Sequence, residues 1–120
     1  MKKQITIVIV LFSIILFSCK KESNDVKGTT WKINYSAAAN GTYTIKFNSD
    51  GSFNYTEGAT VVNNITSGYT QNGDSVVWSF KSSYPSAWYD YRGKISNKSI
   101  SGKIVNKSET DIGTFNGSKN

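Results

Sequence analysis

The chain has 120 residues and a formal net charge of +6, with 14 Lys and Arg against 8 Asp and Glu, no His and one Cys. A chain of this length forms one domain at most. The lack of His excludes Ser-His-Asp and Cys-His catalysis and nearly every zinc site, because these need an imidazole as base or ligand. A lone Cys also excludes a disulfide within the chain.

The first residues have the pattern of an export signal. Lys2 and Lys3 form a positive region, and Ile5 to Phe17 is an apolar run interrupted by Thr6 and Ser13. The run is shorter than the about 20 residues that a membrane-spanning helix needs, and it stands where a cleaved signal peptide stands. We therefore expect a secretory signal peptide.

The residues around the single Cys resemble the lipobox of bacterial lipoproteins. Leu16 is the branched aliphatic residue of that motif, Ser18 the small residue before the cleavage site and Cys19 the residue after it. The resemblance implies that residues 1–18 are a lipoprotein signal peptide and that the Cys19 sulfur carries a diacylglycerol. Residues 19–27 would then be the lipidated Cys and a polar tether. An ordinary signal peptide or an uncleaved N-terminal anchor is the alternative.

The rest of the chain has the composition and the pattern of a β-protein. Leu does not occur after Leu16, and apolar residues alternate with polar ones, as in Thr29–Ser36 and Tyr43–Asn48. A period of two predicts strands with one apolar face, and no segment has the spacing of an amphipathic helix. We expect an all-β domain over residues 28–120.

Turn-forming residues divide this alternation into segments. The turns are expected at Asn40-Gly41, Asn48–Gly51, Gln71–Asp74 and Ser96–Lys98. The eight strands between them are expected at Thr29–Ser36, Thr42–Asn48, Ser52–Glu57, Ile65–Thr70, Ser75–Lys81, Trp88–Ile95, Ser99–Val105 and Ile112–Gly117. Short connections make neighbours antiparallel, so eight strands in sequence order can close into an up-and-down barrel without exposed edges.

Several of these segments resemble the small lipocalin-like domains of lipoproteins from Bacteroidetes-type bacteria. The similar segments are Gly28–Trp31, Phe47–Phe53, Tyr91–Ile95, Ile100–Gly102 and Gly113–Phe115. The resemblance implies an eight-stranded antiparallel lipocalin-like barrel, with Trp31 plugging its closed end.

The apolar faces of the expected strands supply a largely aromatic interior. Its members are Trp31, Ile33, Tyr43, Ile45, Phe47, Phe53, Tyr55, Tyr69, Val76, Trp78, Phe80, Tyr89, Tyr91, Ile100, Ile104 and Phe115. An eight-stranded barrel is just wide enough to be filled by side chains or to hold one small ligand. We expect a mainly filled barrel with at most a shallow cavity. Core packing is the ordinary interpretation, and the candidates for a ligand-binding wall are Trp31, Tyr43, Phe47, Tyr55, Trp78 and Tyr91.

The segment from Lys81 to Trp88 is the most loop-like aromatic stretch. Tyr84 and Trp88 are candidates for rim contacts with a sugar ring or an apolar patch of a partner, and a plug over the barrel mouth is the alternative. Ser75 lies in an Asp-Ser-Val sequence that resembles a bacterial O-glycosylation site and equally marks the start of a strand.

The acidic residues predict no catalytic pair. Glycoside hydrolysis needs two facing carboxyl groups at a set separation. Asp90 falls on the face opposite to Tyr89 and Tyr91, so we expect it outside, in an ion pair with Arg92. We expect no enzyme, no metal and no cofactor.

We therefore expect a lipid-anchored lipoprotein of the cell envelope, at the outer membrane, that acts as a non-catalytic binding or interaction module. Its partners would be the membrane, through Cys19, and a small apolar ligand, a glycan or an envelope protein. Scattered Lys residues argue against a nucleic-acid partner, and we expect a monomer. The main alternative is a carrier of a small apolar or aromatic ligand inside the barrel, and a hydrolytic enzyme is the weaker one.

Overall fold

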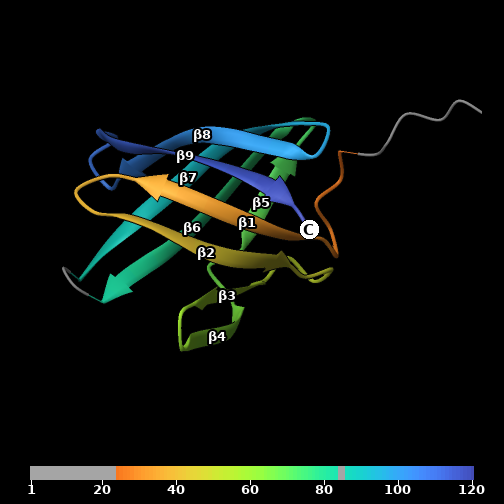
Figure 1. Ribbon diagram of the computed structural model, residues 1–120, viewed down its shortest axis with the longest axis horizontal. Coiled ribbons are helices and arrows are strands. Elements are labelled where there is room, and N and C mark those ends of the chain that lie inside the picture. The colour runs from red at the N-terminus through yellow and green to blue at the C-terminus, as the bar shows by residue number, and fades with distance from the viewer. Residues whose placement is uncertain (1–23, 84–85) are drawn as a thin grey trace, which may run out of the picture.

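The computed structural model describes residues 24–83 and 86–120 (Figure 1). The expected signal peptide, Cys19 and Tyr84 lie outside these residues, so their expected roles stay predictions. In the part of the chain that is described, no helix is long and apolar enough to cross a membrane.

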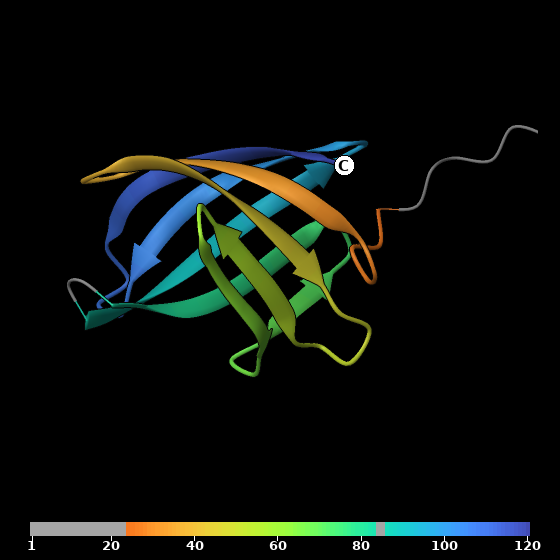
Figure 2. The ribbon, with the colours of Figure 1, turned by 60° about the horizontal axis from the view of Figure 1, so that its bottom comes forward.

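The described residues form one antiparallel sheet of nine strands that curls into a half-barrel (Figures 1 and 2). The strands are β1 (Thr30–Ser36), β2 (Asn40–Phe47), β3 (Phe53–Glu57), β4 (Thr60–Ile65), β5 (Tyr69–Asn72), β6 (Ser75–Ser83), β7 (Ser86–Ser96), β8 (Ser99–Asn106) and β9 (Asp111–Lys119). Their order in the sheet is β4-β3-β2-β1-β9-β8-β7-β6-β5. The first and last strands therefore pair, as an up-and-down barrel requires, and the two edges of the sheet are β4 and β5.

The expected all-β antiparallel fold is confirmed, but nine strands replace the eight expected ones. The expected strand Ile65–Thr70 is divided, because Ile65 ends β4 and Tyr69 begins β5. β4 itself was not expected: its first five residues are exposed, so it has no apolar face to produce an alternating pattern.

The turn expected at Asn40-Gly41 is wrong, because both residues belong to β2 and the turn lies at residues 37–39. Gly41 pairs with Tyr35, and a Cβ at this position would lie 2.5 Å from Cζ of the Tyr35 ring. The glycine thus permits a close approach between a ring and a backbone rather than a turn. The turn expected at Asn48–Gly51 is confirmed, with Gly51 at φ 91°.

Aromatic side chains fill the middle of the half-barrel. Trp78 is fully buried, stacks on Tyr91 with ring centroids 5.4 Å apart, and meets the rings of Phe47 and Phe115 at 5.5 and 5.2 Å. The expected interior residues all belong to the buried core or pack against it; four of them are only partly buried, namely Tyr55, Tyr69, Phe80 and Tyr89. The inward register expected from the alternation is therefore confirmed.

The short segment before β1 also belongs to the folded unit. Val26 is fully buried, and its backbone N–H donates to Oε1 of Gln71 at 3.0 Å. The Gln71 side-chain amide donates in turn to the carbonyl oxygen of Asn24 at 2.6 Å. Residues 24–27, expected as the end of a tether, are thus fastened to the half-barrel beside β5.

Candidate functional site

A cavity of about 520 Å³ opens at the end of the half-barrel where the β1–β2 turn lies. The described residues that line it are mostly aromatic or small and apolar: Tyr35, Ala37, Ala38, Ala39, Tyr43, Tyr55, Glu57, Phe80, Ala87, Tyr89, Tyr91, Ile104, Asn106 and Ile112. The volume lies within the range of about 300–1,000 Å³ that is typical of small-molecule sites.

The period of two along each strand explains how these side chains meet. Tyr55 and Glu57 are two residues apart on β3 and point to the same face, and so do Tyr89 and Tyr91 on β7. The Tyr43 ring on β2 connects these groups, since its centroid lies 5.0 Å from that of Tyr55 and 5.7 Å from that of Tyr91.

Glu57 lies among the rings at the end of β3. Its Oε1 accepts a hydrogen bond from the Tyr55 hydroxyl at 2.8 Å, and its Oε2 accepts one from the Tyr35 hydroxyl at 3.0 Å. The pKa of each tyrosine is raised above its usual value, first by burial and then by the hydrogen bond to Glu57. Both phenols therefore remain neutral donors at physiological pH, and the carboxylate is held in place from two sides.

The floor of the cavity is aromatic and closely packed. The Tyr91 ring stacks on Phe80 with centroids 5.2 Å apart and an interplanar angle of 17°. Below it, the indole Nε1–H of Trp78 donates to the Tyr43 hydroxyl at 3.1 Å. Burial raises the pKa of Tyr43 well above its usual value, so this buried hydroxyl stays neutral.

Three of the six expected wall residues, Tyr43, Tyr55 and Tyr91, line the cavity. The other three, Trp31, Phe47 and Trp78, are buried in the core and do not line it. The Trp31 indole N–H donates a hydrogen bond to Oγ1 of Thr29, the residue before β1, at 2.8 Å.

Trp88, expected at the rim, is 40% exposed on β7 and does not line the cavity.

Sequence reasoning missed the place of Glu57 in the site. Its position two residues after Tyr55, on the same face of one strand, was the available signal, because a carboxylate that continues an apolar face must be satisfied inside.

A more open depression of about 710 Å³ lies at the other end of the half-barrel. Its acidic side chains stabilise the fold: Asp50 accepts hydrogen bonds from Ser52, which lower its pKa, and Asp74 accepts one from the Asn24 amide. Among residues 24–83 and 86–120, no group of three or more His, Cys, Asp or Glu is placed to hold a metal ion.

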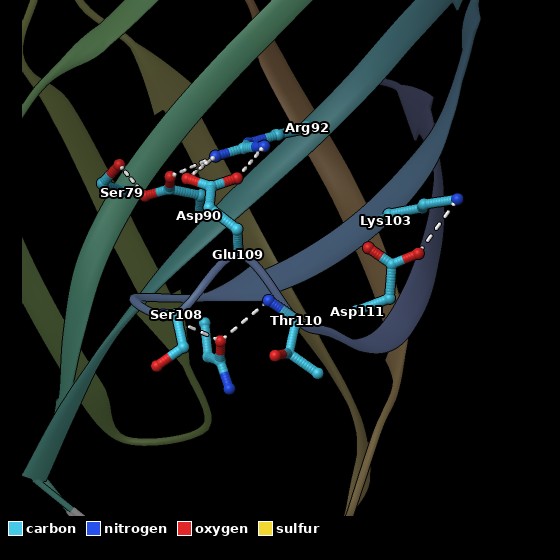
Figure 3. Close-up of polar contacts among 9 residues, drawn as sticks. Ser79, Asp90, Arg92, Lys103, Ser108, Glu109, Thr110 and Asp111 are labelled. Carbon is cyan, nitrogen blue, oxygen red and sulfur yellow. Dashed lines mark hydrogen bonds and ion pairs between the residues drawn. The ribbon is translucent and has the colours of Figure 1, made fainter.

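The ion pair expected between Asp90 and Arg92 is confirmed on the outer face, at 3.1 Å (Figure 3). The guanidinium also donates two hydrogen bonds to Glu109, at 2.8 and 2.9 Å, which lower the pKa of that carboxyl. The Asn106 side-chain oxygen accepts hydrogen bonds from the backbone N–H groups of Ser108 and Thr110 in the same β8–β9 turn. This exposed cluster holds the turn, and such surface pairs contribute little to stability.

Comparison with known proteins gave no match for this chain among family models, curated proteins or solved structures. A proposal for its function therefore has to be argued from its own residues and their geometry.

Proposed function

We propose that this chain is a non-catalytic binding protein of the cell envelope, of lipocalin-like type, that takes up a small, mostly apolar ligand in its aromatic cavity. The observation that supports this most strongly is the cavity of about 520 Å³ above a filled aromatic core. The rings of its wall are fixed by their neighbours, so a ligand would meet a largely preformed site. Of the two binding hypotheses, a small-ligand carrier therefore fits better than a module that uses its rim alone.

A non-catalytic role is supported by the composition of the wall. Among the described lining residues, Glu57 is the single carboxylate, whereas hydrolysis by paired carboxyl groups needs a second one facing it. The tyrosines beside it have raised pKa values and are poor proton acceptors at neutral pH. Their arrangement suits positioning a ligand better than activating one.

We propose that the anchor is a lipidated Cys19 after a cleaved signal peptide. The position at which the chain enters the half-barrel is consistent with such an anchor. Asn24 follows Cys19 by five residues, which span at most about 18 Å. Asn24 is fastened beside β5, at the end of the half-barrel away from the cavity. A membrane reached through Cys19 would thus lie near the end of the half-barrel that holds Asn24, and the cavity would open away from it.

Chemical-shift mapping of the labelled chain with 2-phenylethanol tests the binding site. We expect the shifts to concentrate at residues 37–39 and at Tyr89 and Tyr91, which line the cavity. Ala87→Phe should abolish binding by filling the space between these groups. Ser101→Phe, at an exposed position of β8, is the matched control and should bind as before. Shifts confined to the surroundings of Trp88 would favour a rim interaction instead.

Replacing the single Cys tests the anchor. Cys19→Ala should abolish labelling by a clickable fatty acid, since acylation needs the sulfur, and the precursor should stay uncleaved or free of the membrane. Labelling that persists in this variant would contradict the proposed anchor.

A further inference from the structure

The wall of the cavity combines many aromatic faces with one negative charge. Six of the described lining residues are aromatic: Tyr35, Tyr43, Tyr55, Phe80, Tyr89 and Tyr91. Glu57 is the one acidic residue among the described lining residues, and none of those residues is Lys or Arg. The electron-rich faces of aromatic rings attract cations, as a carboxylate does. The wall thus has two features that favour positive charge, and its described residues include no cationic side chain.

No Lys or Arg within residues 24–83 and 86–120 forms an ion pair with Glu57; the acidic partners of the described ion pairs are Asp90, Glu109 and Asp111. Each Glu57 oxygen instead accepts one hydrogen bond from a tyrosine hydroxyl, at 2.8 and 3.0 Å. A carboxylate has about four lone-pair directions, so each oxygen keeps the capacity to accept a further hydrogen bond. The carboxylate is therefore oriented but not neutralised.

The rings next to Glu57 pack against one another and form one aromatic surface beside the carboxylate. The Tyr43 centroid lies 5.9 Å from that of Tyr35 and 5.0 Å from that of Tyr55, the two residues whose hydroxyls bind Glu57. A cation within about 6 Å of a ring centroid is attracted by the face of the ring. An ammonium group beside Glu57 would then contact the carboxylate and the surrounding rings together.

We propose that the ligand of this cavity is an organic cation: a protonated amine attached to an apolar or aromatic body of small size. This inference rests on the proposed function and specifies its ligand class. The ammonium group binds at Glu57, and the apolar body packs against Phe80, Tyr91 and Ile104. Because the whole chain has a net charge of +6, long-range attraction does not assist a cation, and the preference arises locally at Glu57 and its rings.

Calorimetric titration of the full chain in zwitterionic lipid nanodiscs, with empty discs as the blank, tests this inference. The probes are 2-phenylethylammonium, 2-phenylethanol and 3-phenylpropanoate, which share an aromatic body and differ in charge. We expect the ammonium to bind at least about tenfold more tightly than the alcohol, and the carboxylate to bind most weakly.

Glu57→Gln is the decisive variant, because it keeps the size of the side chain and an oxygen for the tyrosine hydroxyls. It should remove the preference for the ammonium and leave binding of the alcohol within about twofold. Glu109→Gln, which changes an exposed carboxylate on the outer face, is the matched control and should keep the preference.

The two proposals fail in different ways. Equal binding of the ammonium and the alcohol, or a preference that survives Glu57→Gln, would overturn the organic-cation inference and leave a cavity that binds neutral ligands. Binding of the three probes that Ala87→Phe does not weaken would overturn the proposed cavity function itself.

Discussion

The half-barrel is joined by a backbone ladder where β1 meets β9, whereas β4 and β5 at its open side share no ladder. Residues Trp31 to Ser36 pair with Thr114 to Lys119 in unbroken antiparallel register. Gly117 makes this close contact possible, because a Cβ there would lie 2.6 Å from the carbonyl oxygen of Lys32. The closed side thus depends on the close approach of two main chains, which leaves no room for a larger side chain at position 117 of β9.

Ring contacts and isolated hydrogen bonds, rather than a continuous ladder, hold the open side together. The Phe80 ring on β6 contacts the rings of Tyr55 and Phe53 on β3, with centroids 5.5 and 6.5 Å apart. Tyr69 adds two hydrogen bonds, from its hydroxyl to the carbonyl oxygen of Asn48 at 2.7 Å and from its N–H to that of Gly51 at 3.0 Å. Phe80 and Tyr55, which meet across the open side, both also line the cavity, so a substitution at either ring should change ligand binding as well as stability.

The largest expected effect is at the closed side. Gly117→Val should destabilise the fold by at least about 3 kcal/mol, because its side chain would meet the Lys32 carbonyl oxygen and Cδ1 of Ile33, 2.6 and 2.7 Å from the position of a Cβ. Urea unfolding of the variant and the parent chain gives the difference. A loss under about 1 kcal/mol would show that β1 and β9 separate without cost.

Substitution of buried rings should reveal the same difference in stability between the two sides. Trp31→Ala on β1 removes a side chain that is 2% exposed and should cost about 3–5 kcal/mol. Phe80→Ala on β6 removes a partly buried ring and should cost about 2 kcal/mol. Trp88→Ala, at an exposed tryptophan, should cost less than about 1 kcal/mol. Equal losses of unfolding free energy for Trp31→Ala and Trp88→Ala, measured from denaturation curves, would contradict the inward position of Trp31 and the outward position of Trp88.

High pH should destabilise the fold by ionising the buried tyrosines of the cavity. Burial raises the pKa values of Tyr43, Tyr55 and Tyr91 above the usual value of 10.0. Above pH 10 the unfolded chain therefore binds fewer protons than the folded one, so stability is fully present below that pH and falls as the pH rises further. Tyrosinate absorbance should increase together with unfolding, followed by circular dichroism. Ionisation of all tyrosines without unfolding would be inconsistent with their burial.

The smallest effect is expected at the open edge. Val61 and Val62 on β4 are 58% and 44% exposed, so Val61→Thr and Val62→Thr should each change stability by less than about 0.5 kcal/mol. Amide hydrogen exchange should be faster in β4 than in β1 and β9, because β4 has a neighbour on one side and little buried surface. Protection of β4 equal to that of β1 would mean that this edge is covered in solution.

Alternation along the sequence was enough to predict the interior of the sheet, including Trp78 and Phe115, because burial of one face leaves a period of two. It failed at β4, since a strand that buries almost nothing leaves no such period. It also missed the site around Glu57, because the partners of this residue come from β1 as well as β3 and their meeting depends on curvature that alternation does not encode. The expected signal peptide and lipidation of Cys19 remain predictions from sequence.

Gly41 has a consequence for the chemistry of the cavity although it is not among the lining residues. The Tyr35 ring lies across this glycine, and from there its hydroxyl reaches Glu57. A methyl group at position 41 would displace the ring and remove one of the two hydroxyl groups that orient the carboxylate. The selectivity of the cavity would then change through a residue that no ligand touches, and a change of one atom on β2 would act as a tuning position for charge recognition on β3.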